Sequence, residues 1–425
     1  MQLPDTFISL RHMSFSKLAL RVFNDPDVKL FIRTHDNYAC IWSSEEIEAL
    51  LGEEPATVLN NAQVDELLSK GRKPTLSREY KHHFTGDSKD HSLHNKQFEL
   101  LVDQKLSTLS LPNIFKKEVT FLVRLVCIES DKWVQDHSRI TKFTTSLLHH
   151  FHWTQDNKID RHKTAKAIVA DDNIDIRDRF MIASHYCFQE DVFSIWEILD
   201  DTQQSFFKEC DFKMARMWAN WAIYQEELDW EEIARYSGCN GFGLQTYFPK
   251  LKREKRLQKL MSYRRGIWND YHELKSCLSI LDQNEQNEFL KKFPFQVLVL
   301  FLDWSLQAKL LDVVELLWTY LSERDFCGFL YLIHYQKRLS NLIGFDYVTL
   351  VKKLRKRIPF EFGQVIESDT IFNTFRFVLE YEGSRSFPHE LRIHSNYNSL
   401  MAFHAGNTVF VISKYRCHFY SFVVF

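Results

Sequence analysis

The apolar and polar positions of this chain alternate with helical spacing over most of its length. Between Ser14 and Asn24, apolar residues recur every three or four positions. The helix they predict ends ahead of Pro26, because the residue before a proline disfavours the α conformation. A capping box at Ser43–Glu46 predicts a second helix, and residues 62–70 predict a third.

The helical pattern is interrupted once and then continues for nearly three hundred residues. Residues 71–97 are polar and predict a mobile loop or linker. An apolar run over Ile114–Ile128 predicts a helix, and Asp131–Phe151 predicts a separate one. From there to about Glu382, helical patterns follow one another with short polar breaks, which favours an all-α chain.

Four stretches of this region repeat one order of residue types. Each has a bulky residue, an anchor three positions later, a helix-capping residue directly after the anchor, and an aromatic residue eight positions after the anchor. The bulky residues are Trp196, Tyr236, Leu278 and Trp318, the anchors Leu199, Cys239, Leu281 and Leu321, the caps Asp200, Asn240, Asp282 and Ser322, and the aromatic residues Phe207, Tyr247, Phe289 and Phe329. The anchors lie 40, 42 and 40 residues apart.

The repeated order predicts pairs of helices. Asp, Asn and Ser accept hydrogen bonds from free N–H groups at a helix start, so each stretch is interpreted as one helix end followed by a capped new helix. The aromatic residue is expected to face the bulky one. A period near 40 is typical of HEAT-like or armadillo-like arrays. Ile159 and Asp160 fit one period earlier, with Ala167 replacing the aromatic residue. The alternative is a chance match, since 15% of the chain is aromatic.

The end of the chain differs in kind. Val409–Ser413 and Phe419–Phe425 are β-prone, aromatic and free of acidic side chains. One interpretation is a hairpin packed on the last helices. The favoured one is a poorly ordered, non-native tail from a misassigned reading frame, because an uncovered apolar end would promote aggregation.

Composition supports a helical array, and the sequence divides into segments of different character. The 425 residues contain only 12 glycines and 9 prolines, which favours long helices over a β-sandwich. Four segments are predicted: an N-terminal helical region (1–70), a polar loop or linker (71–97), a helical-repeat region (98–382) and an atypical tail (383–425).

Charge and cysteine usage argue against several classes of protein. The formal net charge of −2 gives no overall drive toward nucleic acid or an anionic membrane. The eight cysteines are scattered without a C-x-x-C pair, which indicates reduced thiols in a cytoplasmic or nuclear protein. We find neither a signal peptide nor an apolar run of membrane-spanning length.

Candidate catalytic motifs are absent from the sequence. There is no P-loop, H-E-x-x-H, G-x-S-x-G or kinase signature. Gly238–Gly243 suggests a phosphate loop, but it follows a helical pattern and predicts a helix-ending turn. His149 and His152 would share a helical face, yet a metal site needs three or four ligands, so they are interpreted as surface residues. Trp218 and Trp221 are interpreted as core. We therefore predict no catalytic, metal or cofactor site, and no enzyme.

One basic segment carries a possible binding function. Its cations are Lys250, Lys252, Arg253, Lys255, Arg256, Lys259, Arg264 and Arg265. They could form a phosphate-facing stripe for RNA or DNA, or a nuclear-import signal. A solvated helix face is favoured, because the cations wrap around too much of the helix to form one stripe.

One stretch resembles a known family. Arg179–Trp196 is similar to the R-[FY]-x-x-A-x-x-Y-C-x-x-[ED]-[DE] helices, followed by a Trp, of uncharacterised all-helical proteins that are expanded in arachnid genomes. Lys17–Pro26 also fits, and the resemblance covers about residues 14–380. It implies a helical-repeat fold without an assigned activity or catalytic residues. Small Ala183 would permit a close approach between helices, with Tyr186 filling the adjoining layer.

The sequence therefore predicts an all-α, α-solenoid-like protein. The favoured function is a non-enzymatic scaffold for protein–protein interaction, through one face of the helices or through residues 71–97, argued from the fold alone. The alternative is nucleic-acid binding by Lys250–Arg265. Neither the partner nor the oligomeric state follows from the sequence.

Overall fold

A computed structural model of the chain describes most of its helical residues and part of its C-terminal end. The described residues are 9–35, 40, 44, 88–138, 140–141, 147–237, 241–262, 271–302, 306–323, 325–326, 329–330, 333, 347–357, 362, 364, 376, 378–380, 400–405, 408–413 and 420–423. They belong to two compact units, each described by itself. The first unit comprises Glu129–Lys292, and the second joins Pro4–Ile128 to Phe293–Phe425.

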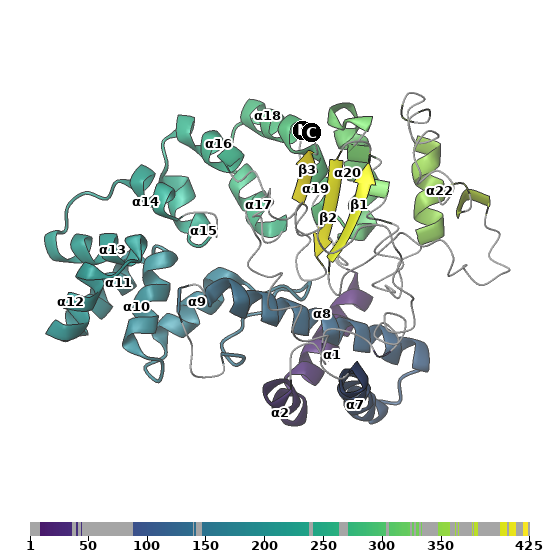
Figure 1. Cartoon of the computed structure of the whole chain (residues 1–425), viewed down its shortest axis with the longest axis horizontal. Coiled ribbons are helices and arrows are strands. Elements are labelled where there is room, and N and C mark those ends of the chain that lie inside the picture. Colours follow the sequence, from purple (N-terminus) through teal and green to yellow (C-terminus); the bar gives the residue numbers. More distant parts are fainter. Residues whose placement is uncertain are drawn as a thin grey trace. The chain divides into compact units, whose positions relative to one another are not determined.

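The first unit is helical throughout its described elements (Figure 1). It begins within α8 (Asn113–His137), which starts in the second unit. The other elements are α9 (Arg161–Ala170), α10 (Ile176–His185), α11 (Gln189–Ile198), α12 (Asp201–Glu209), α13 (Lys213–Tyr224), α14 (Trp230–Tyr236), α15 (Leu244–Tyr247), the 3-10 helix η1 (Phe248–Lys250), α16 (Arg253–Ser262), α17 (Tyr271–Leu278) and α18 (Gln283–Lys292).

The second unit contains helices and the C-terminal strands. Its helices are α1 (Leu10–Phe23), α2 (Pro26–Thr34), α7 (Ser88–Ser107), the first part of α8, α19 (Pro294–Leu300), η2 (Gln307–Lys309), α20 (Leu310–Leu317), η3 (Trp318–Tyr320) and α22 (Tyr347–Arg357). Its strands are β1 (Leu400–Ala405), β2 (Thr408–Ser413) and β3 (Tyr420–Val423). Helices dominate both units, which confirms the predicted all-α class for the chain ahead of these strands.

The boundary between α1 and α2 lies where the proline predicts it. Asn24 ends α1 by donating its backbone N–H to Leu20. Asp25 caps α2 by accepting a hydrogen bond of 3.0 Å from the N–H of Asp27, and Pro26 occupies the first helical position. The predicted helix that follows Ser43–Glu46 and the one over 62–70 lie outside the described residues.

Two predicted boundaries are wrong. The polar segment 71–97 is not a loop from Ser88 onward, because α7 begins there and buries Phe98 farther along its length. The predicted break near residue 130 and the separate helix over Asp131–Phe151 are also wrong, since α8 runs unbroken to His137. The polar residues near position 130 do not interrupt α8 because they are buried in the fold. Glu129 is 5% exposed, and its carboxylate lies 3.7 Å from the Lys158 ammonium.

Two of the four repeated stretches have the same local geometry. Asp200 caps α12 by accepting from the N–H of Gln203, whose side chain accepts from the N–H of Asp200. Asp282 and Glu285 form the same reciprocal pair before α18. A glutamine follows each cap by four positions: Gln204 donates to the carbonyls of Trp196 and Leu199, and Gln286 donates to those of Leu278 and Leu281.

The other two stretches share this geometry less completely. The Ser322 hydroxyl accepts a hydrogen bond of 3.1 Å from the N–H of Asp325, as expected of a cap. Asp160, one period before the first stretch, caps α9. Cys239 and Asn240 lie outside the described residues. The prediction that a helix starts directly after Asn240 is wrong, because α15 begins only at Leu244.

The aromatic residues of all four stretches are buried. Phe207, Tyr247, Phe289 and Phe329 are each 0% exposed. Phe207 and Trp196 both pack on the ring of Phe180. The centroid of Phe180 lies 4.3 Å from that of Phe207 and 5.8 Å from that of Trp196. The local helix-end pattern therefore recurs, while the stacking of helix pairs into a solenoid stays a prediction.

The glycine-rich turn makes a close backbone contact. Gly241 and Gly243 have φ angles of 67° and 71°, in the left-handed region that glycine tolerates best. A Cβ atom on Gly243 would lie 2.8 Å from the carbonyl oxygen of His185 and 3.0 Å from Cys187 Sγ. The turn predicted over Gly238–Gly243 is confirmed for its described part, Gly241–Gly243. Gly243 is needed because it packs on the corner between α10 and α11.

The three C-terminal strands form an antiparallel sheet in the order β1-β2-β3. Leu400 pairs with Ser413 across the first two strands, and Thr408 pairs with Val423 across the last two. Strands over much of both predicted β-prone segments are confirmed, and β1 was not predicted. The interpretation of this end as poorly ordered or non-native stays a prediction.

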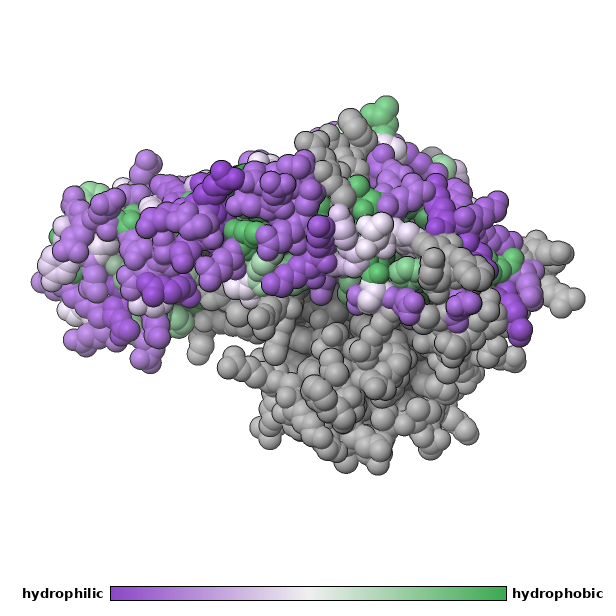
Figure 2. Space-filling view, turned by 90° about the horizontal axis from the view of Figure 1, so that it is seen from above, coloured by the Kyte–Doolittle hydropathy of each residue, from purple (hydrophilic) through white to green (hydrophobic). Residues whose placement is uncertain are grey.

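One face of the described surface is mainly polar. Figure 2 shows a face on which hydrophilic residues prevail and hydrophobic residues form small separate areas. None of the described helices is both long and apolar enough to cross a membrane.

Candidate functional site

A groove of about 660 Å³ lies along α13 and α14 in the first unit. Gln225 ends α13 in the left-handed conformation, with a φ of 50°, and turns the chain. Asp229 then starts α14 by accepting from the N–H groups of Glu231 and Glu232 at 2.9 and 3.1 Å. The groove is lined by Lys213, Arg216, Met217, Asn220, Trp221, Tyr224, Glu226, Glu227, Leu228, Asp229, Glu232 and Tyr236.

One face of α13 is buried in the unit, and the opposite face lines the groove. Met214, Trp218 and other small or apolar residues on one face are buried. The lining residues lie on the other face, at helical spacing. Trp221 stands between the faces: its ring is edge-on to that of Trp218, with centroids 5.3 Å apart, and it is half-buried. The interpretation of Trp221 as core is therefore only partly correct.

Aromatic rings in the groove are accessible to a ligand. Tyr224 is 70% exposed and Tyr236 is 39% exposed. The Tyr236 hydroxyl donates a hydrogen bond of 2.8 Å to Glu232. This hydrogen bond to a carboxylate raises the pKa of Tyr236, so the phenol stays protonated at neutral pH. Together these rings present π faces beside negative charge.

Carboxylates outnumber cations in the groove. The acidic residues are Glu226, Glu227, Asp229 and Glu232, and the basic ones are Lys213 and Arg216. Glu226 and Glu227 are exposed, and neither forms an ion pair within the described part of the chain. The sequence hint for this groove is the acidic pair Glu226 and Glu227, two residues after Tyr224.

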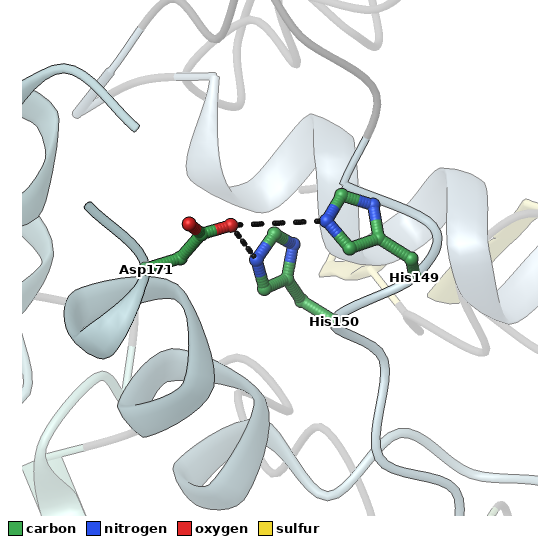
Figure 3. Close-up of side chains that lie close together, drawn as sticks. All are labelled: His149, His150 and Asp171. Atoms are coloured by element: carbon green, nitrogen blue, oxygen red, sulfur yellow. Dashed lines mark hydrogen bonds and ion pairs between the residues drawn. The ribbon is translucent and has the colours of Figure 1, made fainter. Parts of the chain in front are cut away.

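A second candidate is a cluster of His149, His150 and Asp171. The two histidines lie in the turn after α8, and Asp171 directly follows the last residue of α9. His150 Nε2 lies 2.8 Å from Asp171 Oδ2, and His149 Nε2 lies 3.8 Å from the same oxygen. Figure 3 shows both imidazole rings directed toward this carboxylate. The ring centroids are 3.8 Å apart.

Local hydrogen bonds hold the Asp171 carboxylate in place. Its Oδ1 accepts from the N–H of Asn173 at 2.9 Å and from the side-chain amide of Asn173 at 2.8 Å. These bonds, together with the hydrogen bond to His150, lower the pKa of Asp171 to about 2. Asp171 is therefore a carboxylate at neutral pH.

The sequence grouped the wrong histidines. His149 and His152 are expected on one helical face, but residues 148–150 form a turn and residues 151–152 have no regular secondary structure. His152 is exposed and belongs to no cluster of metal-ligating groups found among the described residues. Asp171 was missed because it is distant in sequence. The adjacent histidine pair was the available hint.

The basic segment mostly contacts its own fold. Lys250 lies 4.4 Å from the centre of the Trp230 ring, and Lys252 lies 3.4 Å from a carboxylate oxygen of Glu231. Arg253 forms an ion pair with Asp282, the cap of α18. These contacts join the segment to neighbouring helix ends.

The remaining described cations of this segment divide into two kinds. Arg256 donates to the carbonyls of Leu251 at 3.0 Å and Pro249 at 2.7 Å. Lys259 donates to the carbonyl of Ala234 near the end of α14, where a helix lacks donors. Lys255 is exposed, with no such contact found in the described residues. Arg264 and Arg265 lie outside that description. The cations therefore do not form one free stripe.

A third polar cluster surrounds the buried residue His137, and its contacts stabilise the fold. His137 is 0% exposed, and its ring stacks on Trp133 with centroids 3.7 Å apart. Nδ1 donates to the Trp133 carbonyl at 2.7 Å, and Nε2 accepts from the Tyr186 hydroxyl at 2.8 Å. Burial, together with the positive charge of Arg161, lowers the pKa of His137 to about 3. Both nitrogens are occupied, so His137 has no capacity left for a substrate.

Comparisons with known proteins add no relative to these observations. No family model matches the chain, and no curated protein or solved structure matches it.

Proposed function

We propose that this chain is a non-enzymatic protein-interaction module that binds a basic segment of a partner protein in the groove of α13 and α14. The observation that carries the proposal is the lining of that groove. Exposed rings of Tyr224 and Tyr236 lie beside a surplus of carboxylates, two of which have no ion-pair partner in the described chain.

Lysine and arginine side chains fit this lining by two interactions. An ammonium or guanidinium group over an exposed aromatic ring contributes roughly 0.5–1 kcal/mol. An exposed ion pair with Glu226 or Glu227 contributes about 0.2–1 kcal/mol and weakens with salt. One basic side chain therefore binds weakly, and useful affinity needs a segment that contacts several lining residues at once.

A scaffold built from helix pairs supports this proposal. The capping pairs at Asp200 and Asp282 and the buried aromatic residues after them set similar helix junctions at two places in the first unit. Stacked helix pairs produce extended surfaces on which partner proteins bind. The arrangement of these pairs as an α-solenoid is part of the proposal.

Binding to nucleic acid has less support. Five of the six described cations of the basic segment contact groups of the same chain, so few remain to meet phosphates. Retention of the purified chain on an RNA or DNA column at low salt, lost steeply as salt rises, would favour this alternative over the groove.

The experiment measures binding of fluorescent peptides to the full chain by anisotropy. A lysine-rich peptide should bind, and a glutamate-rich peptide of the same length should not. Tyr224→Ala and Glu227→Lys should each weaken the binding of the lysine-rich peptide. Ile223→Ala is the matched control, because Ile223 is 39% exposed but does not line the groove.

Two outcomes would reject the groove. One is equal binding of the acidic and basic peptides. The other is unchanged affinity in both Tyr224→Ala and Glu227→Lys, with thermal melting showing that the variants are folded.

A further inference from the structure

The cluster of His149, His150 and Asp171 has the dimensions of a metal site. One candidate ligand atom from each residue lies within 4.8 Å of the others. Tetrahedral zinc ligands at about 2.0–2.1 Å from the metal lie about 3.3 Å from one another. The distances from Asp171 Oδ2 to His150 Nε2 and His149 Nε2, 2.8 and 3.8 Å, lie on either side of that value. Small side-chain rotations would therefore place all three around one ion.

An independent observation comes from the second nitrogen of His150. The side chain of His150 is only 7% exposed. Its Nδ1 atom is buried and has no hydrogen-bond partner within the described chain. Figure 3 shows this nitrogen on the side of the ring that faces His149. A buried polar atom without a partner is costly, so Nδ1, unlike the Nε2 that meets Asp171, is unused within the described chain. Either ring nitrogen of a histidine can ligate a metal, so His150 can offer an ion Nδ1 beside His149 or Nε2 beside Asp171.

The third residue is held in position for a ligand role. Asn173 occupies Asp171 Oδ1 with two hydrogen bonds, which leaves Oδ2 directed at the histidines. Hydrogen bonds behind a ligand orient it and are a regular part of metal centres. The carboxylate therefore needs little reorganisation to bind a cation.

We propose that His149, His150 and Asp171 bind a divalent metal ion of the zinc class. Imidazole nitrogens favour zinc, cobalt, nickel and copper, whereas calcium and magnesium favour oxygen ligands. Three protein ligands leave one tetrahedral position for water or an external group. The ion joins the turn after α8 to the end of α9, at a site separate from the groove and independent of the function proposed for it.

The competing explanation is an ordinary histidine–carboxylate hydrogen bond. In that case His150 and Asp171 stabilise the turn, and His149, whose side chain is 63% exposed, lies beside them without a role. The two explanations differ at His149: only the metal site requires it. His149→Ala is therefore the decisive variant, and we expect it to fold because the His149 side chain is largely exposed.

The experiment titrates the metal-free full chain with Co²⁺, followed by visible absorption, and with Zn²⁺, followed by calorimetry. We expect one tight ion per chain. His149→Ala should weaken that binding by more than the roughly 10–100-fold typical of a residue that only supports a ligand. Asp171→Asn should also weaken it. His152→Ala is the matched control, an exposed histidine three positions away that should bind as the parent chain does.

The control is needed because the chain has 18 histidines. Binding that is unchanged in His149→Ala would place any metal elsewhere and overturn the proposal. The absence of tight Co²⁺ and Zn²⁺ binding in the parent chain would overturn it as well. Zn²⁺ should also raise the melting temperature of the parent and of His152→Ala but not that of His149→Ala.

Discussion

Acidification should destabilise the first unit through His137. In the folded chain the two nitrogens of His137 are bonded as in a neutral imidazole, one donating to Trp133 and one accepting from Tyr186. Burial lowers the pKa of His137 to about 3, whereas an unfolded histidine has a pKa of about 6.5. Between these values the unfolded chain binds a proton at His137 that the folded chain does not.

The linkage between pH and stability sets the magnitude. Because the unfolded state binds more protons in this window, the free energy of unfolding falls as pH falls, by about 1.4 kcal/mol per pH unit from one residue. Lowering the pH from about 6.5 to about 5 therefore removes roughly 2 kcal/mol, out of a typical total of about 5–15 kcal/mol. Half-buried His185, whose pKa desolvation lowers to about 4, acts in the same direction.

The assay is urea unfolding at several pH values between about 7 and 5, above the range in which most carboxylates titrate. His137→Gln should be less stable than the parent at neutral pH, because it loses the ring stacking. Its stability should fall less steeply with acidification, by about 1.4 kcal/mol per pH unit. His152→Gln, an exposed control, should keep the parent slope. An unchanged slope in His137→Gln would refute this account of the buried histidine.

Two further predictions concern packing. Gly243→Ala should destabilise the chain by more than the roughly 1–2 kcal/mol of a left-handed alanine, because its Cβ would also meet the His185 carbonyl at 2.8 Å. Gly241→Ala, also at positive φ, is the comparison in urea unfolding, and an equal or smaller loss in Gly243→Ala would contradict the close contact. Phe207→Ala should cost about 3–5 kcal/mol, whereas Phe206→Ala, 46% exposed on the same helix, should cost less than about 1 kcal/mol. Similar losses at both positions in thermal melting would argue against the buried-aromatic assignment.

The sequence predicts the candidate groove only in part. The periodicity of α13 predicts a helix with a buried face, and the acidic run after Tyr224 is evident. Trp221 was assigned to the core because periodicity cannot show that α14 turns back beside α13 and leaves this ring at the edge of a groove. That turn depends on the left-handed conformation of Gln225, a residue with no strong preference for it.

The sequence by itself determined the helix ends that depend on neighbouring residues. Pro26 ends α1, and Asp200 and Asp282 begin α12 and α18, because a capping side chain bonds to N–H groups within three positions. The burial of the aromatic residue after each of these two caps also follows from local spacing. These interactions form wherever the helix forms, so their pattern is readable along the chain.

The tertiary structure alone decided which polar residues meet. Asp171 reaches His149 and His150 only because the turn after α8 comes back to the end of α9. Arg253 pairs with Asp282 across 29 positions of sequence, which changes a candidate phosphate contact into a contact between helices. Charge and burial at such positions depend on residues far away in the chain, and no local periodicity records them.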